Sequence, residues 1–423
     1  MSERAVRAVT ALPDLETPAY LYDLDEVTAS HARLVAALPA PSRLLYSLKA
    51  NPHPAILAVL RAAGCHAEVC SPGELTAALD AGFRAGEVLY TGPGKRDSDL
   101  AAALKAGIRH FSADSPHGLD TLDAAARTLG VTVRCLLRVN DLAPAPGQGL
   151  TMTGVASQFG ADLEWIESRP ELFGHRDRVR ITGLHLYMGS NLAGVDELMA
   201  QFTRSVTVAG RLARSLRTRF EVLNLGGGFP APFARAGAAP PLHPLRDRLA
   251  ALLDAHLPNW RSGDPEVHFE SGRHLVATSG TLLVRACDVK RSHGRDVVVL
   301  DAGINHLGGM SGLRRLPPLL PRLEHAGRAP DRDLDRASRR TFERAIVAGP
   351  LCTPLDTWAR DVALPEVRPG DLLAVPNVGA YGLYASLVAF LGHPAPLEIA
   401  VQDGRVVEVS RLEILRRRTD TKG

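Results

Sequence analysis

The feature that most constrains the fold of this chain is a regular alternation between residues 44 and 270. Short apolar and β-branched runs, typical of buried strands, alternate with longer stretches in which apolar residues recur at the helical period. Eight such units predict an α/β fold of the (β/α)8 TIM-barrel type in preference to an open sheet. The predicted barrel strands are Leu44–Leu48, Ala67–Cys70, Val88–Tyr90, His110–Ser112, Val133–Val139, Ile181–Tyr187, Val222–Leu225 and Val267–Glu270.

The stretches between these runs predict amphipathic helices. Several of them are followed by a glycine, which commonly ends a helix. The predicted helices are Pro54–Ala63, Glu74–Ala81, Leu100–Ala106, Leu119–Leu129, Val195–Leu216 and Leu245–Leu257.

The pattern changes after Gly272, where strand-like runs follow one another without long helices between them. We therefore expect a barrel over residues 27–275 and a β domain built from residues 1–26 and 276–423, to which the run Ala19–Leu24 contributes a strand. The composition of residues 141–160 and 324–340 predicts two long loops. The second loop is charged, and it either faces solvent or docks a carrier protein. The predicted strands of the β domain include Leu282–Val289, Asp296–Leu300, Leu372–Val375 and Leu397–Val401.

Composition excludes several classes of protein. Lys and Arg exceed Asp and Glu by only three, and no basic run is interleaved with aromatic residues, so we expect no nucleic-acid partner. No apolar run reaches the roughly 20 residues of a membrane helix, and residues 1–12 lack a signal-peptide core, so we expect a cytoplasmic protein. The five cysteines form no CxxC pair, and His185 and His306 have no partner at metal-ligand spacing. We expect no metal, and we interpret both histidines as structural.

The unusual side chains of the barrel fall at the carboxyl ends of its predicted strands, where such barrels carry their chemistry. Three consecutive glycines after strand seven leave backbone N–H groups open to a phosphate, and Arg273 can add a charged contact. The sequence therefore predicts a ligand that carries a phosphate. The residues at these ends are Lys49, Glu68, Ser71, Lys95, Arg138, Tyr187, Ser190, Gly226, Gly227, Gly228, Glu270, Gly272 and Arg273.

Lys49 is the candidate nucleophile, because a lysine at the end of a buried strand is costly to bury as a cation and is often catalytic. The alternative is a side chain that extends past the strand end to solvent. A phosphate site and an acid opposite, Glu270, favour a Schiff base. Glu270 could instead simply pair with Arg273, and Cys352 could be an inert thiol, although its turn-rich surroundings leave a functional role open.

Six segments, taken in this order, resemble the ornithine and diaminopimelate decarboxylases, pyridoxal-phosphate enzymes with an alanine-racemase-like fold. The resemblance covers nearly the whole chain. Its segments are Tyr46–Asn51, Ala67–Ser71, Leu225–Phe229, Glu270–Arg273, Gly349–Cys352 and Gly379–Gly382.

The resemblance implies pyridoxal 5'-phosphate as cofactor, bound to Lys49 as a Schiff base, with Glu270 at the pyridine nitrogen and Tyr187 stacked on the ring. It also implies a homodimer with shared active sites, in which Cys352 of the partner subunit returns a proton to Cα. The implied phosphate ligands are Ser190, Gly226, Gly227, Gly228, Gly272, Arg273 and Tyr381, and Glu68 and Arg138 complete the expected cofactor-binding set.

Two positions depart from the pattern of those decarboxylases. Tyr187 stands where they usually carry His, and Thr353 stands where they carry an acid for the distal substrate amine. An uncharged Thr353 removes the ionic anchor for a free diamino acid. With Cys352, Thr353 and Tyr381 at the substrate, the chain more closely resembles a branch that acts on carrier-protein-bound or conjugated amino acids in secondary-metabolite or siderophore biosynthesis.

Three other functions remain open at this stage. A free diaminopimelate or ornithine decarboxylase would share the reaction but not the substrate. An amino-acid racemase would share the barrel and Lys49 but would need a second base, and racemases tend to carry Arg in place of Glu270. A non-catalytic pyridoxal-phosphate-binding protein would generally be a single barrel, which the predicted second domain disfavours.

Overall fold

The structure, a computed structural model, describes residues 3–12, 14–141, 150–151, 154–308, 323–327 and 341–418. It divides into two compact units, which we describe separately. The barrel unit comprises Val27–Ala231 and Ala238–Val276, and the β unit comprises Met1–Glu26, Pro232–Gly237 and Ala277–Gly423. Residues 142–149 and 328–340, in the two long loops that the sequence set apart, lie outside the described residues.

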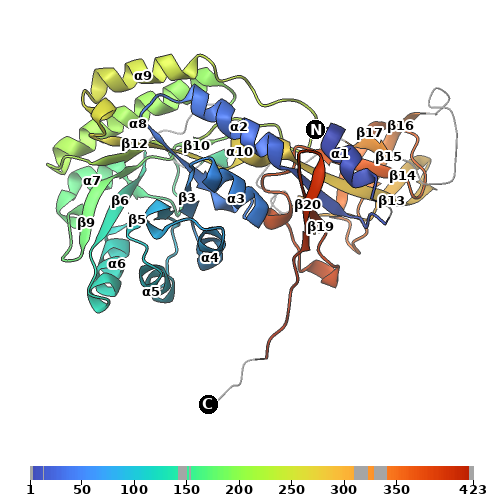
Figure 1. The fold of residues 1–423 in the computed structure, drawn as a ribbon, viewed down its shortest axis with the longest axis horizontal. Coiled ribbons are helices and arrows are strands. Elements are labelled where there is room, and N and C mark those ends of the chain that lie inside the picture. The colour runs from blue at the N-terminus through green and yellow to red at the C-terminus, as the bar shows by residue number, and fades with distance from the viewer. Residues whose placement is uncertain are drawn as a thin grey trace. The chain divides into compact units, whose positions relative to one another are not determined.

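The eight predicted barrel strands all form, and they close into a parallel ring (Figure 1). The strand order is β2-β3-β4-β5-β6-β9-β11-β12, and the pairing of β12 with β2 completes the circle. The predicted barrel is therefore confirmed. Its strands are β2 (Arg43–Ser47), β3 (His66–Val69), β4 (Val88–Tyr90), β5 (His110–Ala113), β6 (Val133–Asn140), β9 (Val179–His185), β11 (Val222–Asn224) and β12 (Glu266–Ser271).

Helices lie outside the ring of strands (Figure 1), and the six predicted from the apolar period are all present. Short strands add to the ends of the barrel: β8 (Ala161–Asp162) pairs with β6, and β7 (Leu150–Thr151) pairs with β10 (Gly189–Ser190). The helices of the barrel unit are α2 (Leu24–Ala37, which begins in the β unit), α3 (Pro54–Ala62), α4 (Pro72–Asp80), α5 (Asp97–Lys105), α6 (Pro116–Thr128), α7 (Leu163–Ser168), α8 (Val195–Ser215), α9 (Leu245–His256) and α10 (Arg273–Val276).

Local sequence signals fix where these helices begin and end, as α4 illustrates. The hydroxyl of Ser71 accepts a hydrogen bond from the backbone N–H of Glu74, and Pro72 occupies the first helical position, where no N–H is needed. Gly82, with φ of 85°, ends the helix in the left-handed conformation that glycine adopts without strain.

The barrel interior is filled by side chains from alternate strands, so it is a packed core and not a pore. One layer consists of Leu45, Leu89, Leu136 and Val222, contributed by β2, β4, β6 and β11. This layer separates the two ends of the barrel, each of which carries polar side chains.

The β unit is built around one mixed sheet, in which β1 pairs in parallel with β19 and antiparallel with β13. The predicted contribution of the N-terminal strand to this domain is therefore confirmed. Helix α1 (Glu3–Thr10) packs its apolar face on the same sheet. The strands are β1 (Ala19–Asp23), β13 (Gly280–Ser292), β14 (Arg295–Leu300), β15 (Glu324–Gly327), β16 (Thr341–Ala348), β17 (Thr357–Pro365), β18 (Leu372–Pro376), β19 (Leu397–Gln402) and β20 (Arg405–Arg411).

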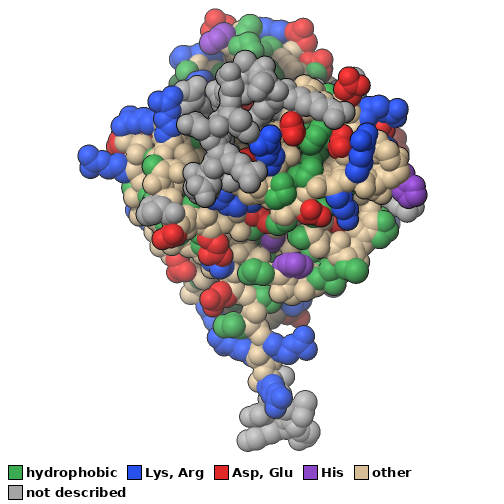
Figure 2. All heavy atoms as spheres, turned by 90° about the vertical axis from the view of Figure 1, so that its right-hand side faces the viewer, with side chains coloured by type: hydrophobic (Ala, Val, Ile, Leu, Met, Phe, Trp, Pro, Cys, Tyr) green, Lys and Arg blue, Asp and Glu red, His purple; other side chains and the backbone are tan. Residues whose placement is uncertain are grey.

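The surface carries both signs of charge. Figure 2 shows basic and acidic side chains interspersed over one face of the molecule, in keeping with the net charge of +3. Among the described residues, no helix has both the length and the apolar character that crossing a membrane requires.

Candidate active site

Lys49 lies in a single turn of helix, Leu48–Ala50, directly after β2 and thus at the carboxyl end of the barrel. Its Nζ is 3.2 and 3.4 Å from the two carboxylate oxygens of Glu68 and 4.0 Å from Sγ of Cys70. The ring centroid of Tyr187 is 6.0 Å away. The carboxylate of Glu68 thus holds the Lys49 amine at the barrel mouth. The Lys49 side chain is 38% exposed, so a ligand can reach it.

Glu68, at the end of β3, is buried and accepts hydrogen bonds from the hydroxyl of Thr91 and from Sγ of Cys70 at 3.0 Å. Burial alone would raise the pKa of Glu68, but the charge of Lys49 and these hydrogen bonds, with one from Ser47, hold it well below its usual value. Glu68 is therefore an ionised carboxylate that positions the Lys49 amine.

Three glycines after β11 form a loop whose backbone leaves no room for side chains. A Cβ on Gly226 would lie 2.9 Å from the ring of Tyr187, and one on Gly227 would lie 2.1 Å from the carbonyl oxygen of Glu270. Gly226 and Gly228 also have φ of 69° and 101°, which glycine adopts without strain.

The hydrogen bonds of this loop use all three of its carbonyls but only one of its N–H groups. Its three carbonyls accept bonds from the backbone N–H of Glu270, from Nε2 of Gln201 and from the backbone N–H of Leu192. The N–H of Gly226 donates to Oδ1 of Asn224. Within the part of the chain that the structure describes, the N–H groups of Gly227 and Gly228 have no acceptor. A phosphate group fits this loop, because its oxygens supply the missing acceptors.

Glu270 is the last residue but one of β12 and is buried beside the glycine loop. Its Oε1 accepts a hydrogen bond of 2.7 Å from Nδ2 of Asn224 and lies 3.2 Å from Nε2 of His185. The other ring nitrogen of His185 is 3.0 Å from the hydroxyl of Ser112. His185 is thus a buried histidine held by Ser112, in keeping with its interpretation as structural, and it also lies beside the carboxylate of Glu270.

The sequence missed Thr91, Asn224 and Ser112 as members of the site. Each is a polar residue at the carboxyl end of a barrel strand or just after it, the same signal that identified Lys49 and Glu270. That signal could have found them.

The remaining barrel residues predicted for the site lie around this centre. Tyr187 is half-buried, burial raises its pKa, and it hydrogen bonds with the side chain of Ser190. Gly272 packs against the turn that carries Lys49, since a Cβ there would lie 2.8 Å from Cβ of Ala50, and the next residue, Arg273, begins α10. Arg138 is buried with its guanidinium 4.6 Å from the ring centroid of Phe159.

Lys95 is the second lysine near the barrel mouth. Its Nζ donates to the carbonyl of Gly92 and is 3.9 Å from the carboxylate of Asp114. Burial lowers the pKa of Lys95. Because its side chain is only 11% exposed, it is far less accessible than Lys49.

Three predicted residues, Cys352, Thr353 and Tyr381, belong to the β unit. Cys352 is exposed on the loop between β16 and β17. Tyr381 has φ of 56°, a left-handed conformation that is strained for a side chain of this size and is often retained at functional sites.

A parallel barrel with a lysine at its mouth, a buried carboxylate opposite and a glycine loop that fits a phosphate is the architecture of barrel-type pyridoxal-phosphate enzymes. Comparison with known proteins identifies the family. Residues 24–277 match the family described as "Pyridoxal-dependent decarboxylase, pyridoxal binding domain", and the chain belongs to it. The protein is a pyridoxal-phosphate-dependent carboxy-lyase.

Relatives align over nearly the whole chain. The L-glutamyl-[BtrI acyl-carrier protein] decarboxylase of Niallia circulans is 31% identical over 94% of this chain and 91% of its own length. The diaminopimelate decarboxylase of Methanothermobacter thermautotrophicus is 30% identical over 96% and 91%. Among solved structures, a mutant of the diaminopimelate decarboxylase from Helicobacter pylori, complexed with L-lysine, superposes with a TM-score of 0.78 at 25% identity, covering 94% and 93% of the two chains. The predicted family, cofactor and reaction are thus confirmed.

Proposed function

We propose that this enzyme decarboxylates an amino acid that is attached to a carrier protein or to another conjugating group. An L-glutamyl group on an acyl carrier protein is the first candidate, because the Niallia circulans relative carries that activity in its name. The observation that carries the proposal is that the loop around Thr353 has no acid free to bind a substrate amine.

The loop Gly349–Asp356 contains one carboxylate, that of Asp356, and backbone N–H groups already bind both of its oxygens. It is buried, and its two oxygens accept hydrogen bonds from the backbone N–H groups of Ile304 at 2.8 Å and Leu351 at 2.9 Å. The backbone N–H of Thr353 donates to the carbonyl of Leu351 at 2.7 Å. This tight loop presents Cys352 and Thr353 but no free acid, so it offers no ionic partner to a substrate ammonium group.

The roles of the barrel residues follow from their positions. Pyridoxal phosphate supplies an electron-withdrawing ring that stabilises the carbanion left by loss of carbon dioxide. Lys49 would hold its carbonyl carbon, with Glu68 fixing the amine, and Glu270 would hold a proton on the pyridine nitrogen.

The phosphate would be held by the N–H groups of the glycine loop, together with Ser190, Gly272, Arg273 and Tyr381. Tyr187 would lie against the ring, where a π face can stack as an imidazole does. Arg138 would add positive charge beside the cofactor.

Cys352 is the proposed acid that returns a proton to Cα. Its exposed position suits a loop that completes the active site of a second subunit, so we propose a homodimer with shared sites. Racemisation would need a second base across the ring from Lys49, and a cysteine is not the usual choice for it.

Free diaminopimelate is the second candidate substrate. It is favoured by the identity of 30% to the archaeal diaminopimelate decarboxylase, almost equal to the 31% found for the carrier-protein enzyme. The lack of a free carboxylate in the loop at Thr353 argues against it.

The test is carbon dioxide release by the pyridoxal-phosphate-loaded enzyme from matched pairs of substrates. Glutamyl carrier protein is compared with free glutamate and with the unloaded carrier, and free diaminopimelate and ornithine are assayed at the same concentrations. Release from the carrier-bound amino acid alone supports the proposal. Faster release from a free diamino acid would show that the proposed substrate is wrong and that the reaction is still decarboxylation. Loss of optical activity without release of carbon dioxide would indicate a racemase.

A further inference from the structure

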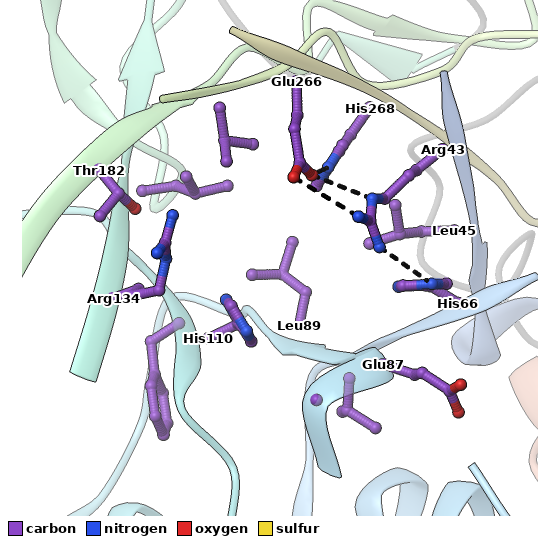
Figure 3. Close-up of a pocket in the computed structure, with 15 residues that line it drawn as sticks. Arg43, Leu45, His66, Glu87, Leu89, His110, Arg134, Thr182, Glu266 and His268 are labelled. Carbon is purple, nitrogen blue, oxygen red and sulfur yellow. Dashed lines mark hydrogen bonds and ion pairs between the residues drawn. The ribbon is translucent and has the colours of Figure 1, made fainter. Parts of the chain in front are cut away.

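The end of the barrel opposite Lys49 carries an open cavity of about 240 Å³ (Figure 3). The amino-terminal ends of the barrel strands line it, whereas Lys49 follows the carboxyl end of β2. Its floor is the apolar layer of Leu45, Leu89, Leu136 and Val222, which separates it from the active site.

The next layer outward is polar. It consists of His66, His110, Thr182 and His268, contributed by β3, β5, β9 and β12, the strands that alternate with those of the apolar layer. Branched apolar residues ordinarily fill such interior layers. Three imidazoles, each partly buried, stand at these positions instead and present ring nitrogens to the cavity.

Two arginines flank the imidazoles from opposite sides of the barrel. Arg43 begins β2 and Arg134 lies near the start of β6, and these strands are separated by three others along the path through β3, β4 and β5. Figure 3 shows their guanidinium groups on either side of the cavity, with Leu89 between them. Each guanidinium group forms one ion pair, Arg43 with Glu266 and Arg134 with Glu221, and carries further N–H donors.

The negative charges of this cavity are already paired. Glu266 lies 3.0 Å from Nε of Arg43 and 3.1 Å from Nε2 of His268. Glu221, which does not line the cavity, pairs with Arg134 at 2.5 Å. Glu87, at the rim, pairs with Arg84.

Of the three imidazoles, only that of His268 contacts a carboxylate among the described residues. Nε2 of His66 is 3.4 Å from a nitrogen of Arg43, and the side chain of His110 makes no hydrogen bond to any residue that the structure describes. Burial first, then the charges of Arg43 and His268, lower the pKa of His66. Burial first, then the charges of Arg134 and His268, lower the pKa of His110. A bound anion would reverse this repulsion.

A cation does not suit the cavity. Among the described residues, no three His, Cys, Asp or Glu side chains converge as metal ligands. The two arginines would repel a metal ion, and they match the geometry of carboxylate or phosphate oxygens.

We propose that this cavity binds a small divalent oxyanion, inorganic phosphate or a dicarboxylate, between the imidazoles of His66, His110 and His268 and the guanidinium groups of Arg43 and Arg134. The site is independent of the substrate proposed above. Binding takes up protons, because the anion stabilises the imidazolium forms. The pKa of Glu266 is lowered to about 2 by its hydrogen bond to His268 and by Arg43, against the effect of burial, so this carboxylate stays ionised and the imidazoles account for the pH dependence.

The test is calorimetric titration of inorganic phosphate into the pyridoxal-phosphate-loaded enzyme, in which the cofactor already occupies the glycine loop. One site per chain is expected, with affinity that increases about tenfold or more from pH 8 to pH 6 and with proton uptake in buffers of different ionisation enthalpy. Succinate replaces phosphate in a second series to distinguish a dicarboxylate from a phosphate ligand, and acetate serves as the monovalent control.

Two variants locate the site. His110→Gln and Arg134→Gln are expected to weaken phosphate binding about tenfold or more. The matched substitution His117→Gln, on the exposed surface of α6, should leave it unchanged. Melting temperatures confirm that each variant is folded, and decarboxylation at pH 8 should equal that of the wild type. Absence of saturable binding at pH 6, or binding that both cavity variants leave unchanged, would overturn the proposal.

Discussion

The substitution Gly227→Ala probes the contact on which the geometry of the proposed site depends. The added Cβ would lie 2.1 Å from the carbonyl oxygen of Glu270 and 3.1 Å from its carbonyl carbon, so the glycine loop and the end of β12 must separate by about 1 Å to reach normal contact. Both atoms belong to backbone, and no flexible side chain can absorb the shift. A displacement of this size at a catalytic carboxylate costs on the order of 100-fold in rate. Overpacking of a buried contact costs about 1–3 kcal/mol of stability.

The assay for Gly227→Ala is kcat/KM for carbon dioxide release at saturating cofactor, together with the affinity for pyridoxal phosphate and the melting temperature. Gly86→Ala is the matched control, because a Cβ there meets no atom within 4 Å. We expect the control to behave as the wild type, while Gly227→Ala loses both rate and cofactor affinity. A folded Gly227→Ala enzyme with activity within about twofold of the wild type would refute the assignment of this loop to the active site.

Three further predictions address other parts of the chain. Burial raises the pKa of Glu398 from 4.5 to about 7 despite hydrogen bonds from two tyrosines, so the folded protein binds an extra proton and its stability falls as pH rises through this range. Glu398→Gln should remove roughly 3 kcal/mol of that fall, measured as the free energy of unfolding in denaturant titrations at several pH values. The same dependence of stability on pH in the variant and the wild type would contradict the interpretation. Thr353→Asp should raise the rate on free diaminopimelate roughly tenfold or more, since a charge-assisted contact contributes about 1.5–3 kcal/mol, whereas Thr353→Ser should not. Coexpressed Lys49→Ala and Cys352→Ala subunits should recover about a quarter of wild-type activity if each active site is shared between two subunits. Half of the dimers then contain one subunit of each kind, and one of the two sites in such a dimer is intact. No recovery would exclude shared sites.

The barrel could be predicted from the sequence because its strands are buried on both faces and read as continuous apolar runs. The strands of the β unit were predicted less completely: β13, β14, β18 and β19 are apolar enough to recognise, but β15, β16, β17 and β20 were missed. In β20, Val407 and Val409 are each 53% exposed, so its pattern lacks the buried face that marks a strand.

The site could be predicted where a residue type is unusual for its position, as with Lys49 and the three consecutive glycines. The site could not be predicted where the role of a residue depends on which strands lie next to one another in the barrel. Ser112, His185 and Glu270 lie on β5, β9 and β12, and only the closed barrel brings them together. The same holds for the cavity at the opposite end, because His66, His110 and His268 are separated by 202 residues of sequence from first to last.

The most direct test of the account is the identity of the lysine that carries the cofactor. The pyridoxal-phosphate-loaded enzyme is reduced with borohydride and digested, and the labelled peptide is identified by mass spectrometry. A phosphopyridoxyl group is expected on Lys49, whose amine is accessible beside Glu68. A label on Lys95, the buried lysine with a lowered pKa, would contradict the proposed active site.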